Sequence, residues 1–250
     1  MSTDEGTPVR HHSTPGVYNL RDTGGYRAEG GTSRWGKLFR SDALHLLDEP
    51  GRDLLTELGI THVIDLRSTD ERRAAPNALH GLEVQVHHLP VSDNAAPTAL
   101  ASLQLGLAPI YDRMVDERGT QLADAIRVIA AADDDEAVLV HCTAGKDRTG
   151  LVIAFALSAV GVDRDDVVAD YAQTAQNLRG EWSERTLAGL RNGGRELTPQ
   201  VVEVVTTSPA DVLDTLLNRI EQQYGSMRGY LAAHGLSDPD LDRLTAVLVA

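Results

Sequence analysis

The chain has 250 residues, of which 42% are hydrophobic and 24% charged, the proportions of a globular protein with a substantial core. Its formal net charge of -14 argues against a nucleic-acid binder, so any site for an anion must be local and made from a few well-placed donors. The single cysteine excludes an intramolecular disulfide and any metal site made from several cysteines.

The beginning of the chain is polar. Residues 1–15 predict a mobile tail, and residues 16–250 predict a single domain. The tail lacks the apolar core of a signal peptide, and no apolar run reaches the roughly 18 residues that span a membrane. These features predict a cytoplasmic protein without stable membrane insertion, and they leave export by a leaderless route open.

Strands and helices are predicted to alternate through the first half of the chain. A helix begins near Asp48, and apolar runs rich in β-branched residues follow at 59–68, 84–91 and 137–142. Residues 105–131, between the last two runs, have helical composition. This alternation predicts an α/β fold in which a mainly parallel sheet is flanked by helices.

The C-terminal half is predicted to be helical. Thr198-Pro199 and Ser208-Pro209 each place a capping residue before a proline that suits the first helical position. Apolar residues at helical spacing then form two stripes that predict core packing. The stripes are Val212, Leu213, Leu216, Leu217 and Ile220, then Leu241, Leu244 and Leu248.

The only cysteine and one of only two lysines stand together in HCTAGKDRTG, residues 141–150. The predicted strand ends at Cys142 and an apolar helix opens at Arg148. A loop that runs into a helix N-terminus turns its N–H groups toward an oxyanion, and the positive helix end favours a thiolate. Arg148 can hold a phosphate through two parallel hydrogen bonds. The pattern therefore predicts a nucleophile beside a phosphate site, made from Thr143, Ala144, Gly145, Lys146, Asp147, Arg148 and Thr149.

Two simpler interpretations of this stretch are less favoured. A nucleotide-binding P-loop requires glycine five residues before Gly145 and Ser or Thr after Lys146, where this chain has Val140 and Asp147. A lone cysteine is more often a small buried hydrophobe. In this chain the cysteine is followed by a glycine, an arginine and a threonine, and the whole stretch lies between a strand and an apolar helix. This combination favours the interpretation of the cysteine as a nucleophile.

The same stretch resembles the signature loop of the cysteine-dependent phosphatases, and the wider chain is similar to their bacterial protein-tyrosine phosphatase branch. The segments that carry this likeness are NLRDTGGY (19–26), LFRSDAL (38–44), LGITHVIDLRS (58–68), HLPVSD (88–93), ADY (169–171) and YGSMRGYL (224–231). The resemblance implies the α/β phosphatase fold, no metal or other cofactor, and activity on phosphotyrosine in proteins. Relatives also accept phosphoserine, phosphothreonine and phosphoinositides.

The resemblance and the chemistry together suggest roles for individual side chains. Cys142 attacks phosphorus and forms a phosphocysteine, while Arg148 and the loop N–H groups hold the equatorial oxygens. The acid that protonates the leaving group is either Asp147, inside the loop, or Asp93, after the second predicted strand. Relatives carry an aspartate at both positions. Lys146 adds a second cation, which suits substrates with more than one phosphate, such as phosphoinositides.

Two other functions compete with that of a tyrosine phosphatase. A catalytically silent module would use the same loop only to bind a phosphorylated partner, but such a module usually lacks the cysteine, the arginine or the acid. An inositol-phosphate phosphatase would share the loop pattern. Its highly charged substrate calls for a more basic surface than a net charge of -14 provides.

Residues 173–205 differ from the core helices on either side of them. They combine several glycines with few apolar anchors, of which Trp182 is the largest. Relatives in the bacterial branch have helical covers over the phosphate site. We therefore predict that residues 173–205 form a mobile helical lid and that Trp182 contributes to substrate contacts.

Overall fold

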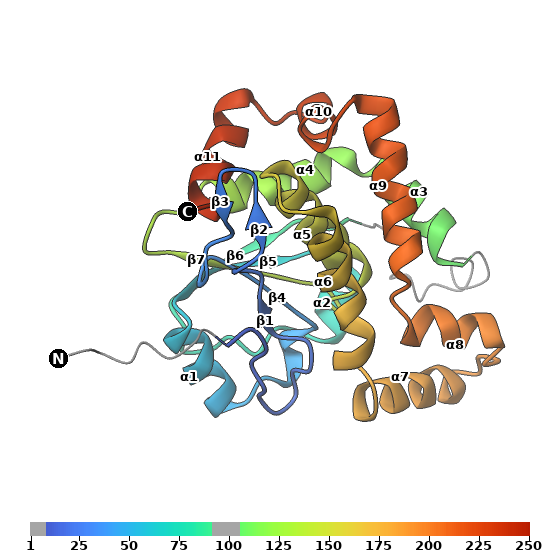
Figure 1. Ribbon diagram of the computed structural model, residues 1–250. Coiled ribbons are helices and arrows are strands. Elements are labelled where there is room, and N and C mark those ends of the chain that lie inside the picture. Colours follow the sequence, from blue (N-terminus) through green and yellow to red (C-terminus); the bar gives the residue numbers. More distant parts are fainter. Residues whose placement is uncertain (1–8, 92–105) are drawn as a thin grey trace.

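A five-stranded sheet forms the centre of the computed structural model, which describes residues 9–91 and 106–250 (Figure 1). The described strands are β1 (Arg21–Asp22), β2 (Arg27–Ala28), β3 (Gly31–Thr32), β4 (Leu38–Ser41), β5 (Ile60–Asp65), β6 (Gln85–His88) and β7 (Ala137–His141). The sheet has the order β1-β4-β7-β5-β6, and β2 pairs with β3 in a separate ribbon. Strands β4, β7, β5 and β6 are parallel, and β1 is antiparallel at the edge. The predicted mainly parallel sheet is confirmed.

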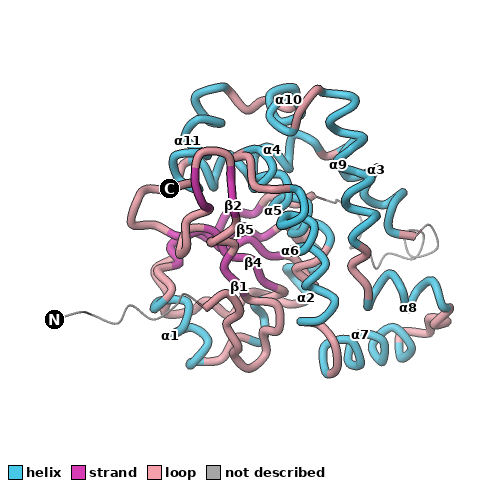
Figure 2. The backbone as a smooth tube through the Cα atoms, in the orientation of Figure 1, coloured by secondary structure: helices cyan, strands magenta, loops and turns pink. Residues whose placement is uncertain are grey.

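Helices cover both faces of the sheet and make up nearly all of the C-terminal half (Figure 2). Those in the described residues are the 3-10 helix η1 (Leu44–Leu46), α1 (Glu49–Glu57), α2 (Thr69–Ala74), α3 (Leu107–Glu117), α4 (Gly119–Ala130), α5 (Asp147–Ala159), α6 (Arg164–Asn177), α7 (Glu181–Asn192), α8 (Pro199–Thr206), α9 (Ala210–Tyr224), α10 (Met227–Ala233) and α11 (Asp238–Leu248). Within the described ranges, no helix combines the length and apolarity needed to cross a bilayer.

The core is divided by the sheet into two parts. Successive side chains of a strand point to opposite faces, and β7 shows this clearly. Val138 and Val140 belong to the larger cluster with the C-terminal helices, whereas Ala137 and Leu139 belong to the smaller cluster on the α1 face. Both faces of β7 are therefore buried, which explains its uninterrupted apolar sequence.

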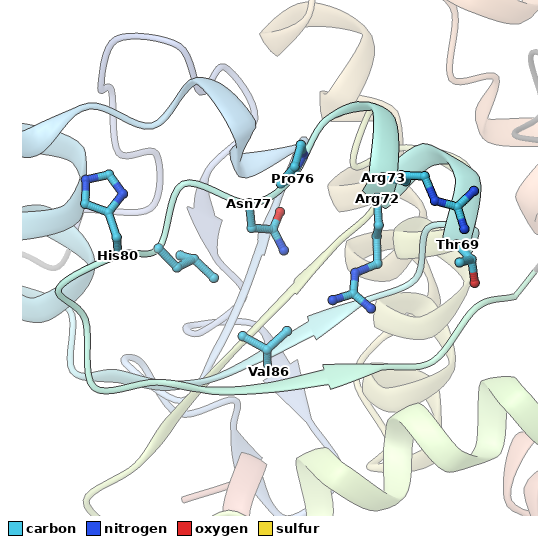
Figure 3. A pocket seen from close by; sticks show the side chains of 8 residues that line it. Thr69, Arg72, Arg73, Pro76, Asn77, His80 and Val86 are labelled. Atoms are coloured by element: carbon cyan, nitrogen blue, oxygen red, sulfur yellow. The ribbon is translucent and has the colours of Figure 1, made fainter.

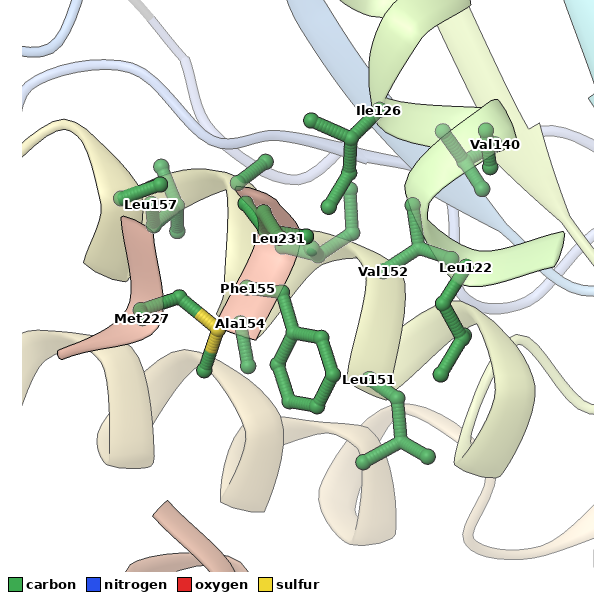
Figure 4. Packing of buried hydrophobic residues seen from close by; sticks show 14 of the residues in the cluster. Leu122, Ile126, Val140, Leu151, Val152, Ala154, Phe155, Leu157, Met227 and Leu231 are labelled. Atoms are coloured by element: carbon green, nitrogen blue, oxygen red, sulfur yellow. The ribbon is translucent and has the colours of Figure 1, made fainter. Parts of the chain in front are cut away.

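Helix α5 is the central helix of the larger layer. Almost all of its residues are buried, and Leu151, Phe155 and their neighbours pack against α4 and α10 (Figure 4). Phe155 is fully buried, and truncation of such a side chain to alanine costs about 3–5 kcal/mol. The helix is thus held tightly, and so is the loop that precedes its N-terminus.

The predicted helix starts are correct at two places and wrong at one. Asp48 caps α1, and the Thr198 side chain accepts a hydrogen bond from the N–H of Val201 at 3.3 Å in α8. The predicted cap at Ser208 is wrong, because α9 begins at Ala210 and Pro209 is its N-cap residue. Pro209 has an extended backbone, which leaves Ser208 one residue too early to reach the first turn.

The structure describes residues 9–15 of the predicted N-terminal tail. Residues 1–8 lie outside the described part of the chain, but the following residues are paired with the sheet. The N–H of His12 donates to the carbonyl of Leu20 at 3.0 Å, and Asp22 donates to the carbonyl of Arg10 at 2.9 Å. Backbone hydrogen bonds therefore hold part of the predicted tail against the first strand.

Candidate active site

The loop of residues 141–150 joins the end of β7 to the start of α5, as the sequence predicts. Gly145 lies in its middle with φ +62°, a backbone region that other residues rarely adopt. A Cβ atom there would approach the carbonyl oxygen of Ser41 to 2.2 Å. Glycine is therefore required for the loop to turn tightly against the end of β4.

Side chains behind the loop hold its carbonyl groups away from Cys142. The Asn19 amide donates to the carbonyls of Ala144 at 3.3 Å and Gly145 at 3.1 Å. Arg40 also donates to the Gly145 carbonyl, at 2.7 Å. By contrast, the backbone N–H groups of residues 143–148 donate to no other described residue. A run of N–H groups without protein partners is suited to an anion.

Arg148 adds a further free donor to this run of N–H groups. Its side chain is 1% exposed, and its Nη1 and Nη2 atoms donate to the two oxygens of Glu71 at 2.7 and 2.9 Å. The buried Nε atom has no partner among the described residues. The bidentate pair fixes the plane of the guanidinium. The Nε–H group therefore remains available to a ligand.

Glu71 is a functional residue that the sequence analysis missed. Burial raises the pKa of its carboxyl, but the hydrogen bonds and charge of Arg148 outweigh burial and lower the pKa to about 2. The spacing of Ser68 and Glu71 is that of a capping box, which the structure contains. That local pattern predicts the start of α2 and gives no sign of a contact with an arginine far along the chain.

His141 supports the loop from within the sheet. It is completely buried, with Nε2 3.6 Å from the Asp65 carboxylate. Burial lowers its pKa to about 4, so the ring is neutral at pH 7. Asp65 is paired with Arg67 at 2.8 Å, and Arg67 does not line the cavity at Cys142. These residues are framework.

Of the two candidate acids, Asp147 lies on the same cavity as Cys142. Its carboxylate accepts a hydrogen bond from the Tyr111 hydroxyl at 2.7 Å, and Tyr111 is itself 2.6 Å from the Tyr171 hydroxyl. The Tyr111 hydroxyl, itself held by Tyr171, thus fixes one oxygen of the Asp147 carboxylate. Asp93 lies outside the described residues.

Lys146 does not stand free in the loop. Its ammonium group is buried and donates to two carbonyls at the C-terminal end of α8, those of Val204 and Thr207, the second at 3.0 Å. It also lies 3.5 Å from the Asp147 carboxylate. A cation at a helix C-terminus is stabilised by the helix dipole. Lys146 therefore joins the loop to α8 in this structure.

The cavity above Cys142 is small and closed. Its volume is about 50 Å³, and Cys142 is 2% exposed. Helices α7 and α8 cover it, and Thr149 below it has a buried hydroxyl without a partner among the described residues. The cavity is lined by Cys142, Thr143, Ala144, Lys146, Asp147 and Arg148 of the loop, Trp182 and Thr186 of α7, and Val204 and Val205 of α8.

A buried charge network lies behind the loop. Asp170 of α6 pairs with Arg21 at 3.0 Å and with Arg40, and all three side chains are almost completely buried. Burial raises the pKa of Asp170, but the charges and hydrogen bonds of the two arginines outweigh burial and lower the pKa to about 2. Since Arg40 also holds the Gly145 carbonyl, this network connects β1, β4 and α6 to the loop.

Comparisons with known proteins agree with this geometry. A model of the tyrosine phosphatase family matches residues 12–250. The triple specificity protein phosphatase PtpB of Mycobacterium tuberculosis is 34% identical over 94% of this chain and 98% of that protein. A tyrosine-protein phosphatase of Nostoc commune is 29% identical over 82% of this chain and 71% of that protein. The matched region contains the loop and both helices that cover it.

Proposed function

The chain belongs to the tyrosine phosphatase family, and from that membership we propose that it hydrolyses phosphotyrosine in proteins through a phosphocysteine formed on Cys142. The observation that carries this proposal is the set of free donors around Cys142. The N–H groups of residues 143–148 and the buried Nε atom of Arg148 have no partner among the described residues, and all of these residues except Gly145 line the cavity at Cys142. Such donors match the three equatorial oxygens of a phosphoryl group in transfer.

The proposed reaction has two steps. The Cys142 thiolate attacks phosphorus, the bond from phosphorus to the tyrosine oxygen breaks, and the aspartic acid gives its proton to that oxygen. Water then attacks the phosphocysteine and gives a proton back to the same carboxylate, which releases inorganic phosphate and the thiolate. Asp147 lines the same cavity as Cys142, which supports it as the acid, while Asp93 remains the other candidate. The free hydroxyl of Thr149 is suited to donate to the leaving thiolate.

The contacts that the Lys146 ammonium makes with α8 favour a substrate with a single phosphate. In the closed structure its ammonium is bound to carbonyls at the end of α8, so the described residues that line the cavity offer no free second cation. A phosphoinositide with further phosphates would have to displace α8 from Lys146. We extend the proposal to phosphoserine, phosphothreonine and phosphoinositides because PtpB is named a triple specificity phosphatase. Phosphotyrosine remains the favoured substrate, since it does not require α8 to leave Lys146.

The proposal predicts turnover that needs no metal and is sensitive to oxidation. Hydrolysis of an aryl phosphate and of a phosphotyrosine peptide is expected to persist in EDTA, to be lost to peroxide and to return with a thiol, because a thiolate oxidises reversibly to the sulfenic acid. Acid quenching during turnover is expected to yield covalent phosphate on the peptide that contains Cys142. Loss of activity to the chelator, or indifference to peroxide, would contradict the thiolate mechanism.

Substrate entry requires movement of α7 and α8. Ligand pockets usually measure about 300–1,000 Å³, whereas the closed cavity measures about 50 Å³. We propose that residues 173–205 act as a lid and that the contact of Lys146 with α8 keeps it closed. The apolar cluster of Leu178, Trp182 and Val205 packs against Tyr18 and Ala144 outside the lid, which adds to the closed state. A lid of this kind also limits access of small oxidants to Cys142.

Replacing Lys146 with methionine is expected to loosen the lid, because α8 loses the cation at its C-terminal end. Hydrogen exchange at residues 199–206 should become faster, and so should peroxide inactivation. Removal of a cation beside the thiolate would by itself slow oxidation, so an increased rate is specific to opening. Lys37→Met is the matched control, since Lys37 also donates to a backbone carbonyl, that of Asp134, but away from the site. Unchanged hydrogen exchange in α8 would contradict the proposal that Lys146 keeps the lid closed.

A further inference from the structure

A groove outside the active site lies between α2, the segment that follows it, and strand β6 (Figure 3). Its volume of about 500 Å³ is about ten times that of the cavity above Cys142. The groove is lined by Thr69, Arg72 and Arg73 of α2, Pro76 and Leu79 of the following segment, and Val86 of β6. It therefore combines two cations on one side with an apolar surface on the other.

Strand β6 is the outermost strand of the sheet, and its Val86 lines the groove. The N–H of Leu89 donates to the carbonyl of Asp65 at 3.0 Å, so the peptide groups of alternate residues of β6 face β5. Those of Val86 and His88 point the other way and make no backbone hydrogen bond with any described residue. The Val86 side chain is 39% exposed, which is unusual for a large apolar residue of this chain. An extended segment could pair with this edge.

The two arginines give the groove a charge opposite to that of the whole protein. Arg73 is 74% exposed, and its partner Asp70, at 2.9 Å, is itself exposed to water. Arg72 is 39% exposed and lies 3.5 Å from Asp65, whose carboxylate is already paired with Arg67. Both guanidinium groups thus keep donors for a further anion. In a chain of net charge -14, this patch selects acidic ligands locally.

Helix α2 connects the groove to the active site. Glu71 of this short helix holds Arg148, while its neighbours Arg72 and Arg73 line the groove. The two sites are therefore on opposite sides of one helical turn. An extended chain spans about 3.3 Å per residue, so residues that flank the phosphorylated side chain can extend past α2 toward the groove.

We propose that this groove binds an extended acidic segment of the phosphorylated protein substrate, with its backbone along β6 and its carboxylates on Arg72 and Arg73. This inference rests on the proposed phosphatase function and narrows its substrate class to phosphoproteins with acidic residues near the phosphorylated side chain. A small aryl phosphate fills only the catalytic cavity, so its turnover does not depend on the groove.

The test compares peptides of equal length that carry phosphotyrosine with acidic, alanine or lysine flanks. Wild type is expected to prefer the acidic peptide in kcat/KM, and Arg73→Glu to reduce that preference by up to about fivefold, since exposed ion pairs contribute about 0.2–1 kcal/mol each. Turnover of a small aryl phosphate should be unchanged. The preference should also weaken with added salt. Arg243→Glu is the matched control, because Arg243 forms a similar pair with Asp240 on α11, far from β6.

Binding separates failure of the groove from failure of the proposed reaction. Fluorescence anisotropy with a labelled acidic peptide measures affinity without turnover. If no substrate is hydrolysed but Arg73→Glu still weakens peptide binding, the groove stands and the phosphatase proposal fails. Equal preference for all three peptides in wild type would overturn the groove. So would an Arg73→Glu effect confined to vesicles that contain phosphoinositides, because that result would assign the cations to a lipid surface.

Discussion

Replacement of Cys142 with serine is expected to lower kcat by several orders of magnitude and to preserve the fold. A neutral hydroxyl is a far poorer nucleophile than a thiolate, and loss of a nucleophile in comparable enzymes has an effect of this size. The substitution is nearly isosteric at a buried position, so packing between β7 and α5 changes little. The measurement is kcat on an aryl phosphate, together with the thermal unfolding midpoint.

Substrate binding provides the control for this variant. The N–H groups of residues 143–148 and Arg148 are untouched, so Cys142→Ser should still bind a phosphotyrosine peptide. Retained turnover above about a tenth of the wild-type rate would contradict the mechanism, because the effect of a lost nucleophile is much larger. Loss of both turnover and binding with an unchanged fold would show that the sulfur contributes to the anion site itself.

The sequence was most informative where local pattern determines structure. The strand, loop and helix around Cys142 are predictable because β-branched residues, Gly145 and an apolar helix follow one another within a short stretch. By contrast, β1 and β4 were not predicted. These strands are short, and their buried Arg21 and Arg40 make them look like polar surface segments.

Contacts between distant segments account for the rest. Glu71 holds Arg148 across 77 residues, and Lys146 reaches carbonyls 58 and 61 residues away. No periodicity or spacing in the sequence records such pairs. The sequence therefore suggests that Lys146 is a free cation in an anion site. In the structure its ammonium already donates to backbone carbonyls at the C-terminal end of α8.

The buried network at Asp170 carries the largest expected effect on stability. One carboxylate pairs with both Arg21 and Arg40, and all three side chains are almost completely buried. Removal of one partner from a buried ion pair costs about 3–5 kcal/mol, because the remaining charge is left without a counterion in a region of low polarity. Here two guanidinium groups would be left, and Arg40 would hold the Gly145 carbonyl less firmly.

We therefore expect Asp170→Asn to lower the free energy of unfolding by about 3–5 kcal/mol at pH 7 and to reduce kcat through the loosened loop. The native pKa of about 2 lies below the ordinary value of 3.8, so the stabilisation is present above pH 4 and is lost as pH falls toward 2. Urea unfolding should accordingly show a smaller difference between wild type and variant at pH 3 than at pH 7. Asp163→Asn is the control, since Asp163 pairs with the exposed Arg27 at 2.8 Å and its loss should cost less than about 1 kcal/mol. Equal effects of the two substitutions, or a difference that does not shrink in acid, would mean that the Asp170 charge does not hold the network together.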